Sequence, residues 1–546
     1  MVKNHLTAPT LFRRYIHLSY LFIPFIFLSA CSSPEEKSPP NILFAIADDA
    51  TYKHFGAYGS DWIQTPAFDY VAREGVLFMN AYTNNSKCSP SRSILLTGRH
   101  SWQLEEAANH VPNFPERFKT FPEALSENGY KTGYTGKGWA PGNPGTVNGE
   151  VRQLIGPAFN EISTTPPGGH ISQIDYAANF DQFLNEKDEG RPFFFWYGGY
   201  EPHRAYEYGV GIKNGGKTAD QINEIPAFWA NNDTVRTDML DYAFEIEYFD
   251  QHLQRILQIL EEHGVLDNTL VIVTSDNGMP FPRVKGQAYD YSNHMPLAIM
   301  WNEEIPHKNR IIQDFVSFID VAPTILELAG IHQEQSGMEP ITGKSLTETL
   351  FTDKSGTIDP GRDYVLIGKE RHDIGRPDDH GYPIRGIVTD DYLYLHNFKA
   401  NRWPAGPPET GYLNTDGSPT KTWILNHRDE PEFQKYWELS FGKRPAEELY
   451  DMNEDPYNVN NLLLSPEHEA YLEIADRLRS RMFELLEKQG DPRMFGNGYV
   501  FDNYLYSEEK NRNFYEKYMT GELDKSDAGW VNPTDFENRV SNSENE

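Results

Sequence analysis

The amino-acid sequence predicts an α/β fold around a mostly parallel central sheet, followed by a smaller α+β subdomain with an antiparallel sheet. Continuous apolar runs, which are typical of strands buried on both faces, occupy residues 41–47, 192–197, 269–274 and 296–301. Amphipathic helical patterns separate these runs, and strands that alternate with helices favour a layered α/β sandwich. The 546 residues, 38% of them hydrophobic, are sufficient for one large and one smaller domain.

Two helix signals lie between the strand runs. Thr65 followed by Pro66 is a capping residue with proline at the first helical position, which predicts the start of a helix. Between Leu240 and Glu262, apolar side chains recur at three- and four-residue steps, and Gly264 follows as a stop signal. We expect such helices to pack on the central sheet through their apolar faces.

The sequence pattern changes after about residue 350. Short alternation of apolar and polar residues over 384–398 predicts an antiparallel hairpin, and a loop rich in proline and glycine follows at 402–420. A further helix is expected at 467–486. These signals assign residues 41–360 to the large domain and residues 361–540 to the smaller subdomain, and no internal repeat is present.

Both ends of the chain are expected to lie outside the folded domains. A basic pair, an apolar run and small residues indicate a signal peptide over residues 1–30. The run Leu-Ser-Ala-Cys ending at Cys31 resembles the lipobox of bacterial lipoproteins, so we expect Cys31 to be lipidated and 31–40 to tether the protein to a membrane. An ordinary secretory signal with an incidental cysteine is the alternative. The polar residues 541–546 are expected to be disordered.

These features predict an exported bacterial lipoprotein at the outer membrane or cell surface, and a periplasmic position remains open. Acidic residues outnumber basic residues 80 to 49, which gives a formal net charge of −31. Such a charge excludes nucleic acid as a partner, because nucleic-acid-binding surfaces are basic. An anionic substrate therefore requires a local cluster of Arg, Lys and His. The two cysteines, Cys31 and Cys88, lie in unrelated contexts and exclude a disulfide framework.

Acidic and amide side chains come directly after two of the predicted strands. Asp48 and Asp49 follow the first strand, and Asp276 and Asn277 follow the strand at 269–274. Sites in open α/β sheets form beyond the carboxyl ends of strands, and hard oxygen ligands suit Ca²⁺ or Mg²⁺. Either pair alone is typical of a turn or a cap. Their equivalent positions together predict a metal site.

A short motif surrounds Cys88. The run Cys-Ser-Pro-Ser-Arg extends from Cys88 to Arg92, and Leu-Thr-Gly-Arg follows at 96–99. A lone cysteine is usually a small half-buried hydrophobic group. Here the two runs resemble the Cys-X-Pro-X-Arg signature of type I sulfatases. In that family, a formylglycine-generating enzyme oxidises the cysteine to formylglycine.

Further motifs of this family occur in the family's order along residues 41–456. They are Asn41–Asp49, Gly136-Lys137, Pro202-His203, Ser275–Gly278 and Glu448–Asp451. The resemblance implies an alkaline-phosphatase-like fold for the large domain and a bound Ca²⁺, with Mg²⁺ as the second choice. The implied metal ligands are Asp48, Asp49, Asp276, Asn277 and residue 88, which is Cys88 before its oxidation.

The resemblance also implies the catalytic residues. One hydroxyl of the hydrated formylglycine at position 88 is expected to attack sulfur and form a covalent sulfate ester, which divides one difficult step into two easier ones. The second hydroxyl then loses its proton, the aldehyde forms again, and sulfate leaves. Arg92 is expected to orient position 88. Lys137 and Lys285 are expected to stabilise charge on the sulfuryl oxygens, and His203 to protonate the leaving atom. Outside these motifs, a single lysine or histidine is most often a solvated surface group.

The sequence departs from the family at one position. The family usually has Gly-Lys-X-His, and this histidine helps to break down the sulfated intermediate. The chain instead reads Gly-Lys-Gly-Trp and has Trp139 at that place. We expect His100 or His110, which follow the signature, to take over this role.

A charged loop after the strand pattern Tyr-Val-Leu-Ile-Gly is the predicted substrate loop. Its candidate substrate-binding residues are Arg371, His372, Arg376 and His380. They are suited to hydrogen-bonding a sugar and its carboxylate, and the alternative is a solvated loop. Trp403 is expected either to pack in the core or to stack on a sugar ring.

The run Asp-Asn-Gly-Met-Pro-Phe-Pro at 276–282 resembles the family branch that contains N-sulfoglucosamine sulfohydrolase, whose bacterial relatives include enzymes acting on ulvan. We expect a sulfatase acting on sulfate esters of a polysaccharide such as ulvan or of its oligosaccharides. Three alternatives stay open: an N-sulfoglucosamine sulfohydrolase acting on heparan-type fragments, a formylglycine-dependent phosphonate or phosphate monoester hydrolase, and an inactive carbohydrate-binding lipoprotein. The absence of a histidine directly after Asn277 opposes the second, and the intact nucleophile and metal positions oppose the third.

Overall fold

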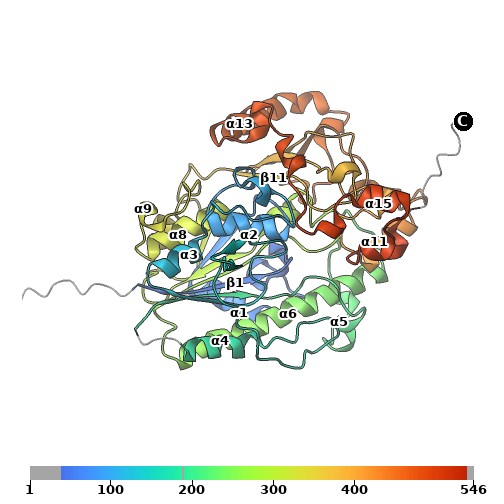
Figure 1. The fold of residues 1–546 in the computed structure, drawn as a ribbon. Helices are drawn as coiled ribbons and strands as arrows, with labels where there is room; N and C mark the ends of the chain where they lie inside the picture. Colours follow the sequence, from blue (N-terminus) through green and yellow to red (C-terminus); the bar gives the residue numbers. More distant parts are fainter. Residues whose placement is uncertain (1–38, 187–189, 538–546) are drawn as a thin grey trace, which may run out of the picture. The chain divides into compact units, whose positions relative to one another are not determined.

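The computed structural model describes residues 39–186 and 190–537, and the described residues from Pro39 onward form one compact unit (Figure 1). The expected signal peptide, Cys31, most of the tether and the tail at 541–546 lie outside the described residues. In the described ranges, no helix is both long and apolar enough to cross a membrane.

An eight-stranded sheet forms the centre of the fold, in the order β10-β2-β9-β7-β1-β6-β3, with β8 paired to β2. Its strands are β1 (Asn41–Ala47), β2 (Val76–Tyr82), β3 (Lys131–Gly136), β6 (Phe193–Gly198), β7 (Thr269–Ser275), β8 (His294–Met295), β9 (Leu297–Met300) and β10 (Arg310–Ser317). Only the pairs that involve β8 or β9 are antiparallel. The predicted, mostly parallel α/β sheet is therefore confirmed.

Helices cover both faces of this sheet, because each central strand is apolar on both sides (Figure 1). In β1, Leu43 and Ala45 face α1, α4 and α6, whereas Ile42 and Phe44 face α2, α3 and α8. The helices are α1 (Pro66–Glu74), α2 (Cys88–Thr97), α3 (Phe121–Glu127), α4 (Tyr176–Asn185), α5 (Val210–Lys213), α6 (Asp233–Glu262), α7 (Asp290–Asn293), α8 (Val321–Leu328), α9 (Gln333–Ser336) and α10 (Thr347–Phe351).

The predicted helix at 240–262 is longer than expected, because α6 begins at Asp233. The Asn232 side chain accepts a hydrogen bond from the backbone N–H of Val235 and caps this start. The predicted strand at 296–301 is shorter than expected, because β9 begins at Leu297 after Pro296. Proline has no backbone N–H to donate to a strand ladder.

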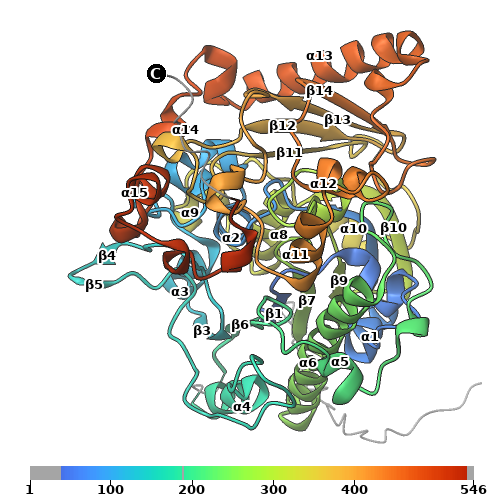
Figure 2. The same cartoon turned by 90° about the vertical axis from the view of Figure 1, so that its right-hand side faces the viewer.

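A four-stranded antiparallel sheet follows, in the order β11-β12-β13-β14 (Figure 2). Its strands are β11 (Val365–Lys369), β12 (Ile384–Val388), β13 (Tyr392–Asn397) and β14 (Glu447–Asp451). Helix α13 (Leu472–Lys488) lies across this sheet, and its Leu478 and Met482 pack with Ile387 and Tyr394. The predicted hairpin at 384–398 is thus present, and the predicted helix at 467–486 is shifted to α13.

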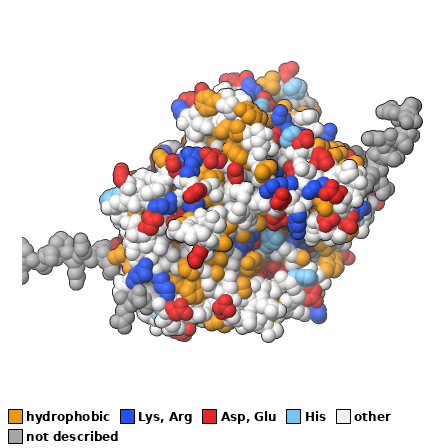
Figure 3. All heavy atoms as spheres, viewed as in Figure 1, with side chains coloured by type: hydrophobic (Ala, Val, Ile, Leu, Met, Phe, Trp, Pro, Cys, Tyr) orange, Lys and Arg blue, Asp and Glu red, His pale blue; other side chains and the backbone are white. Residues whose placement is uncertain are grey.

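Part of the expected C-terminal subdomain packs on the large sheet instead of on the small one. Tyr412 and Phe441 belong to the same hydrophobic core as α6. This region contains α11 (Pro419–Asn426) and α12 (Gln434–Ser440), and the chain ends with α14 (Val500–Asn503) and α15 (Phe514–Thr520). A small ribbon of β4 (Thr146–Val147) and β5 (Glu150–Val151) projects from the large domain. On the face seen in Figure 3, acidic and basic side chains are interspersed.

Candidate active site

The ends of β1 and β7 bring three carboxylates together. These strands are parallel neighbours with Ala47 opposite Ser275, so the residues that follow them meet at one edge of the sheet. The backbone N–H of Asp49 donates to Oδ1 of Asp276 at 3.0 Å. Oxygen atoms of Asp48, Asp49 and Asp276 lie within 4.8 Å of one another, and all three residues are fully buried. Such a cluster requires compensating positive charge.

Asn277 completes an oxygen donor set that fits a divalent cation. Its amide nitrogen donates to Oδ1 of Asp49 at 2.6 Å, so its Oδ1 is directed elsewhere. Among the described residues this buried Oδ1 has no hydrogen-bond partner. Carboxylate and amide oxygens are the ligands of hard cations such as Ca²⁺ and Mg²⁺. The residues therefore fit the predicted metal site.

Cys88 begins helix α2 and points its sulfur at these carboxylates. The Sγ atom lies 3.5 Å from Oδ1 of Asp48 and 3.8 Å from Oδ1 of Asp49. The residue is 1% exposed, and burial raises the pKa of its thiol. The helix is buried on all sides, so the backbone holds position 88 beside the metal site.

Arg92, one turn further along α2, ties three segments together. Its Nε donates to Oδ2 of Asp276 at 2.9 Å. Its Nη1 donates to the carbonyls of Lys137 and Gly138 at 2.9 and 2.8 Å, and its Nη2 lies 3.6 Å from Asp48. The five donors of a guanidinium allow such simultaneous contacts. Arg92 thereby holds Lys137 and Gly138 against the metal site.

Two buried lysines provide positive charge beside the carboxylates. Lys137 Nζ lies 2.6 Å from Oδ2 of Asp48, and Lys285 Nζ lies 2.6 Å from Oδ2 of Asp49 and 2.8 Å from Oδ2 of Asp416. Burial alone lowers the pKa of Lys137, but Asp48, Cys88 and Asp276 together outweigh it and raise that pKa above its ordinary value. Both lysines line the cavity beside Cys88 and can contact an anionic group there.

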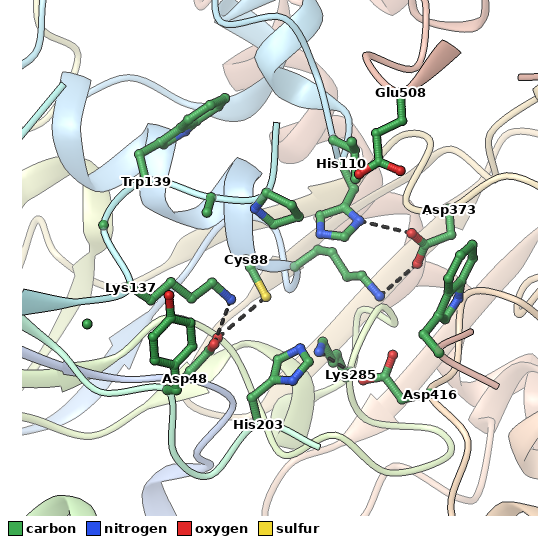
Figure 4. A pocket seen from close by; sticks show the side chains of 18 of the residues that line it. Asp48, Cys88, His110, Lys137, Trp139, His203, Lys285, Asp373, Asp416 and Glu508 are labelled. Carbon is green, nitrogen blue, oxygen red and sulfur yellow. Dashed lines mark hydrogen bonds and ion pairs between the residues drawn. The ribbon is translucent and has the colours of Figure 1, made fainter. Parts of the chain in front are cut away.

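His203 lies near Cys88, between Asp48 and Lys285 in the view of Figure 4. Its Nδ1 is 2.5 Å from the carbonyl oxygen of Arg204, so Nδ1–H donates to that oxygen. The other ring nitrogen, Nε2, lies 3.8 Å from Oδ2 of Asp49, and the side chain is 36% exposed. This arrangement directs Nε2 toward the site while leaving it accessible to a substrate.

These side chains line a cavity of about 640 Å³, the Cys88 cavity, a size typical of small-molecule sites. Later parts of the chain close the cavity opposite the sheet edge (Figure 4). These later residues are Asp373, Asp416, Tyr506, Glu508 and Trp530. The sequence did not predict Asp416, Tyr506, Glu508 or Trp530 as site residues. Asp373 lies within the predicted substrate loop but was not among its candidate residues. No motif marks them, and only long-range packing brings them to Cys88.

The structure distinguishes the two candidate histidines. His110 lines the Cys88 cavity, and its Nδ1 lies 3.0 Å from Oδ1 of Asp373. Burial lowers the pKa of His110 to about 4, although the Asp373 carboxylate opposes this shift. The neutral ring therefore donates from Nδ1 to Asp373, and its buried Nε2 has no partner among the described residues. Lys87 Nζ holds the same carboxylate at 2.8 Å.

His100 lies elsewhere. Its ring stacks on Trp102 at a centroid distance of 4.4 Å, and burial lowers its pKa to about 3. It borders a different cavity near Arg362 and not the Cys88 cavity. Trp139, at the place of the family's histidine, donates its indole N–H to Ser93 Oγ at 2.8 Å.

The structure brings Asp373 of the predicted substrate loop to the Cys88 cavity, but none of the four candidate substrate-binding residues. His372 is fully buried, with Nε2 2.7 Å from Oδ1 of Asn85, and Arg371 donates to the carbonyl of Tyr504. Arg376 and His380 line a separate cavity together with Trp403. The four side chains therefore lie outside the Cys88 cavity, and their contact with a substrate elsewhere stays a prediction. Backbone carbonyls accept from Arg371 and Arg376, and the Asn85 side chain contacts His372, so these polar residues have partners inside the fold.

Comparisons with known proteins agree with this geometry. The chain is 28% identical to human N-sulphoglucosamine sulphohydrolase, over 83% of this chain and 91% of that protein. It is 27% identical to an ulvan-active sulfatase of Formosa agariphila, over 85% of this chain and 83% of that protein. A phosphonate monoester hydrolase of Agrobacterium radiobacter shares the fold, with a TM-score of 0.60 at 19% identity over 82% of this chain and 96% of that one.

The match to a family model is more direct. The model of the Sulfatase family matches residues 40–331, which is more than half of the chain. The matched range contains the three clustered carboxylates, Cys88 with Arg92, and both lysines of the cavity. The chain therefore belongs to the sulfatase family, whose members hydrolyse sulfate esters with a formylglycine and a divalent metal.

Proposed function

We propose that this sulfatase removes O-linked sulfate from a sulfated polysaccharide such as ulvan, or from its oligosaccharides. The observation that carries the proposal is the Cys88 cavity, in which position 88 lies between an oxygen-lined metal site and two lysines. The similarity to two ulvan-active sulfatases, at 27% and 25% identity, supports the polysaccharide class.

Each group of the cavity has a distinct part in this proposal. A formylglycine at position 88 would supply the nucleophilic hydroxyl once it is hydrated to a gem-diol. Arg92 fixes the first turn of α2, so position 88 stays aligned with the metal ligands. Lys137 and Lys285 lie where negative charge develops on the sulfuryl oxygens, and the accessible Nε2 of His203 donates a proton to the leaving oxygen.

His110 takes the place of the histidine that Trp139 replaces. The Asp373 carboxylate fixes the tautomer of His110 with the proton on Nδ1, and the unpartnered Nε2 is then free to accept a proton. The Lys87 ammonium keeps Asp373 ionised, because it lowers the pKa of that carboxyl against the effect of burial. His100 lacks this arrangement and lies outside the cavity.

Calcium is the proposed metal, with Mg²⁺ second. The sheet edge offers four protein groups with oxygen donors, and Ca²⁺ accepts such oxygen-rich, irregular sets more readily than Mg²⁺ does. A formylglycine-generating enzyme is the proposed maturation partner of Cys88. The proposed location is the outer membrane or cell surface of a bacterium, through lipid on Cys31, with a periplasmic position as the alternative.

A second candidate is hydrolysis of N-linked sulfate on heparan-type fragments. It is favoured by the Asp-Asn-Gly-Met-Pro-Phe-Pro run and by the 28% identity to N-sulphoglucosamine sulphohydrolase. A phosphonate or phosphate monoester hydrolase is less favoured, because no histidine follows Asn277 to extend the oxygen-rich metal site. An inactive carbohydrate-binding protein is also less favoured, because the nucleophile position, the metal ligands and both lysines are present.

Sulfate release tests the proposal. The protein is co-expressed with a formylglycine-generating enzyme, supplied with calcium, and offered ulvan-derived O-sulfated and heparan-derived N-sulfated oligosaccharides, with Cys88→Ala as the control. Release from the ulvan fragments alone is the expected result. Release from the N-sulfated fragments alone would reverse the choice of linkage. Release from neither, with formylglycine detected at position 88 by mass spectrometry, would refute both and direct the search to phosphonate esters.

A further inference from the structure

A second cavity of about 270 Å³ lies under the loop between β11 and β12. We propose that this Trp403 cavity is a non-catalytic site for an anionic sugar unit of the polysaccharide, bearing either a sulfate or a carboxylate. Its defining residues are Arg376, His380, Arg402, Trp403, Glu409 and Tyr515. The proposal rests on the polysaccharide substrate class proposed above.

The Trp403 cavity is distinct from the Cys88 cavity, and the two share no lining residue. They are nevertheless close neighbours. Asp373 lines the Cys88 cavity, and Arg376, three residues later, lines the Trp403 cavity. Three residues of extended chain span at most about 11 Å, so a short oligosaccharide has the length to contact both sites.

Arg376 carries a buried positive charge without an acidic partner. It is 2% exposed, and its guanidinium donates to the carbonyls of Trp403 at 2.8 Å and Pro404 at 2.9 Å. Within the described ranges, no carboxylate forms an ion pair with it, and burial lowers its pKa to about 10. Burying an unpaired charge is costly, and an anion in the adjoining cavity compensates it. This feature sets the sign of the ligand.

The remaining polar groups suit the rest of a sugar. One carboxylate oxygen of Glu409, Oε2, is buried and lacks a hydrogen-bond partner among the described residues, so it can accept from a hydroxyl. Arg402 is held by Asp502 at 3.2 Å and therefore adds donors with little net charge. Donors on one side and an acceptor on the other orient a ligand that has both an anionic group and hydroxyls.

Two aromatic rings form the apolar part of the cavity. Trp403 and Tyr515 line it and are only half-buried, so their rings remain available for contact. Lys443 lies over the Trp403 ring with Nζ 5.1 Å from its centroid, which fixes that ring in place. Aromatic surface with a few converging polar groups is the usual composition of a small-molecule site.

The wall of the cavity is held in an uncommon backbone conformation. Asp378 and Asp379, directly before His380, both have positive φ, 57° and 51°. Non-glycine residues rarely adopt this region, and two in succession persist only when the surroundings hold them. Here the C-terminal segment does so, because Glu516 accepts from the backbone N–H of Asp378 and Asp379 accepts from that of Asn513. The segment that fixes the wall also supplies Tyr515.

Affinity electrophoresis tests the site without requiring turnover. The full-length protein and its Trp403→Ala variant are run through native gels that contain ulvan, alginate or dextran. Trp423→Ala is the matched control, because Trp423 is a half-buried tryptophan that stacks on His427 and lines neither cavity. Melting temperatures of the three proteins verify that each is folded, and Tyr515→Ala is a second variant should Trp403→Ala unfold.

We expect ulvan to retard the wild-type protein and Trp423→Ala equally, and the Trp403→Ala variant at least threefold less. Equal retardation by alginate, which has carboxylates and no sulfate, identifies a general oxyanion site, whereas retardation by ulvan alone identifies a sulfate site. Unchanged retardation of folded Trp403→Ala, or equal binding to neutral dextran, would overturn the proposal. Because binding is measured without sulfate release, this result is separable from failure of the proposed activity.

Discussion

The Cys88 cavity has two walls whose polar residues are organised differently. The sheet-end wall is formed by Asp48, Cys88 and Lys137, and Asp49, Arg92 and Asp276 lie directly behind it. The far wall consists of His110, Asp373, Asp416, Tyr506, Glu508 and Trp530. On the sheet-end wall, the charged groups pair with one another inside sequence motifs. On the far wall, they come from segments that are distant in sequence, so tertiary packing assembles this wall.

The largest expected effect is the loss of Arg92 from behind the sheet-end wall. Arg92→Ala leaves the buried carboxylates of Asp48 and Asp276 without their shared cation, so we expect the free energy of unfolding to fall by about 3–5 kcal/mol. Urea denaturation measures this change. Arg73→Ala is the control, since Arg73 is 59% exposed beside Glu74, and it should change stability by about 0.5 kcal/mol at most.

A fall in stability as small as that of the control would mean that the carboxylates do not depend on Arg92. The sheet-end wall would then not be the charge-balanced unit that its geometry describes.

On the far wall, we expect the largest loss of activity from substitution of His110. His110→Ala removes the free Nε2, and we expect the turnover number for sulfate release to fall roughly 100-fold, a typical loss for a proton-transfer group. His100→Phe is the control, because it keeps the stacking on Trp102 and should retain turnover. Asp373→Asn should reproduce part of the loss by disturbing the tautomer of His110. Full turnover of His110→Ala would exclude this histidine from the reaction.

These two walls also explain how much of the site could be predicted from sequence. Asp48 and Asp276 were predictable because parallel neighbouring strands place their ends together, and Cys88 because its motif is contiguous. Trp530 was not predictable, since no sequence motif around it indicates that it lies near Cys88 in the fold. The predicted substrate loop shows the opposite error, in which a residue was expected at the substrate and lies in the interior. His372 is polar, yet the fold buries it against Asn85, and the local sequence does not reveal such burial.

Removal of the metal should affect the stability contributed by the sheet-end wall but not that contributed by the far wall. Chelation should lower the melting temperature, because the oxygen cluster at the sheet end then loses its compensating cation. Calcium added at about 100 times its dissociation constant should restore roughly 2.7 kcal/mol. Scanning calorimetry with calcium or magnesium measures the gain. Trp530→Ala on the far wall should respond like the wild-type protein, and loss of its calcium response would contradict the division into walls.

Burial of His100 makes the stability of the fold depend on pH. The folded pKa of His100 is about 3 because burial opposes its charged form, whereas an unfolded histidine titrates near 6.5. The unfolded chain therefore binds the proton first, and stability is lost as pH falls from 6.5 toward 3. His100→Phe should reduce the slope by about 1.4 kcal/mol per pH unit in this window. Denaturation at several pH values measures it, and an unchanged slope would show that His100 titrates freely in the fold.

The fold was predictable for strands that are buried along their whole length. It was less predictable for segments that could join either of two hydrophobic cores. Strand β1 reads as a two-sided buried strand because both of its faces are apolar. Tyr412 and Phe441, in contrast, pack with α6 although they follow the small sheet's hairpin in sequence. Periodicity describes one element at a time, so it cannot state which of two cores a distant segment joins.

The smallest expected effect concerns Trp530, which lines the far wall and donates its indole N–H to the carbonyl of Leu413 at 2.8 Å. No hydrogen bond among the described residues joins it to the metal ligands or to Cys88, so we expect it to affect substrate binding and not the chemical step. Trp530→Ala should raise KM about tenfold, equal to about 1.4 kcal/mol of binding, with kcat nearly unchanged. Tyr499→Ala, an aromatic residue 62% exposed in the same C-terminal region, should alter neither constant.

Steady-state sulfate release over a range of oligosaccharide concentrations separates the two constants. A fall in kcat at constant KM would assign Trp530 to the chemical step, because groups that act only in the transition state leave substrate binding unaffected. The far wall would then take part in catalysis through more than His110. A change confined to KM instead means that the C-terminal segment selects the substrate while the sheet end performs the reaction.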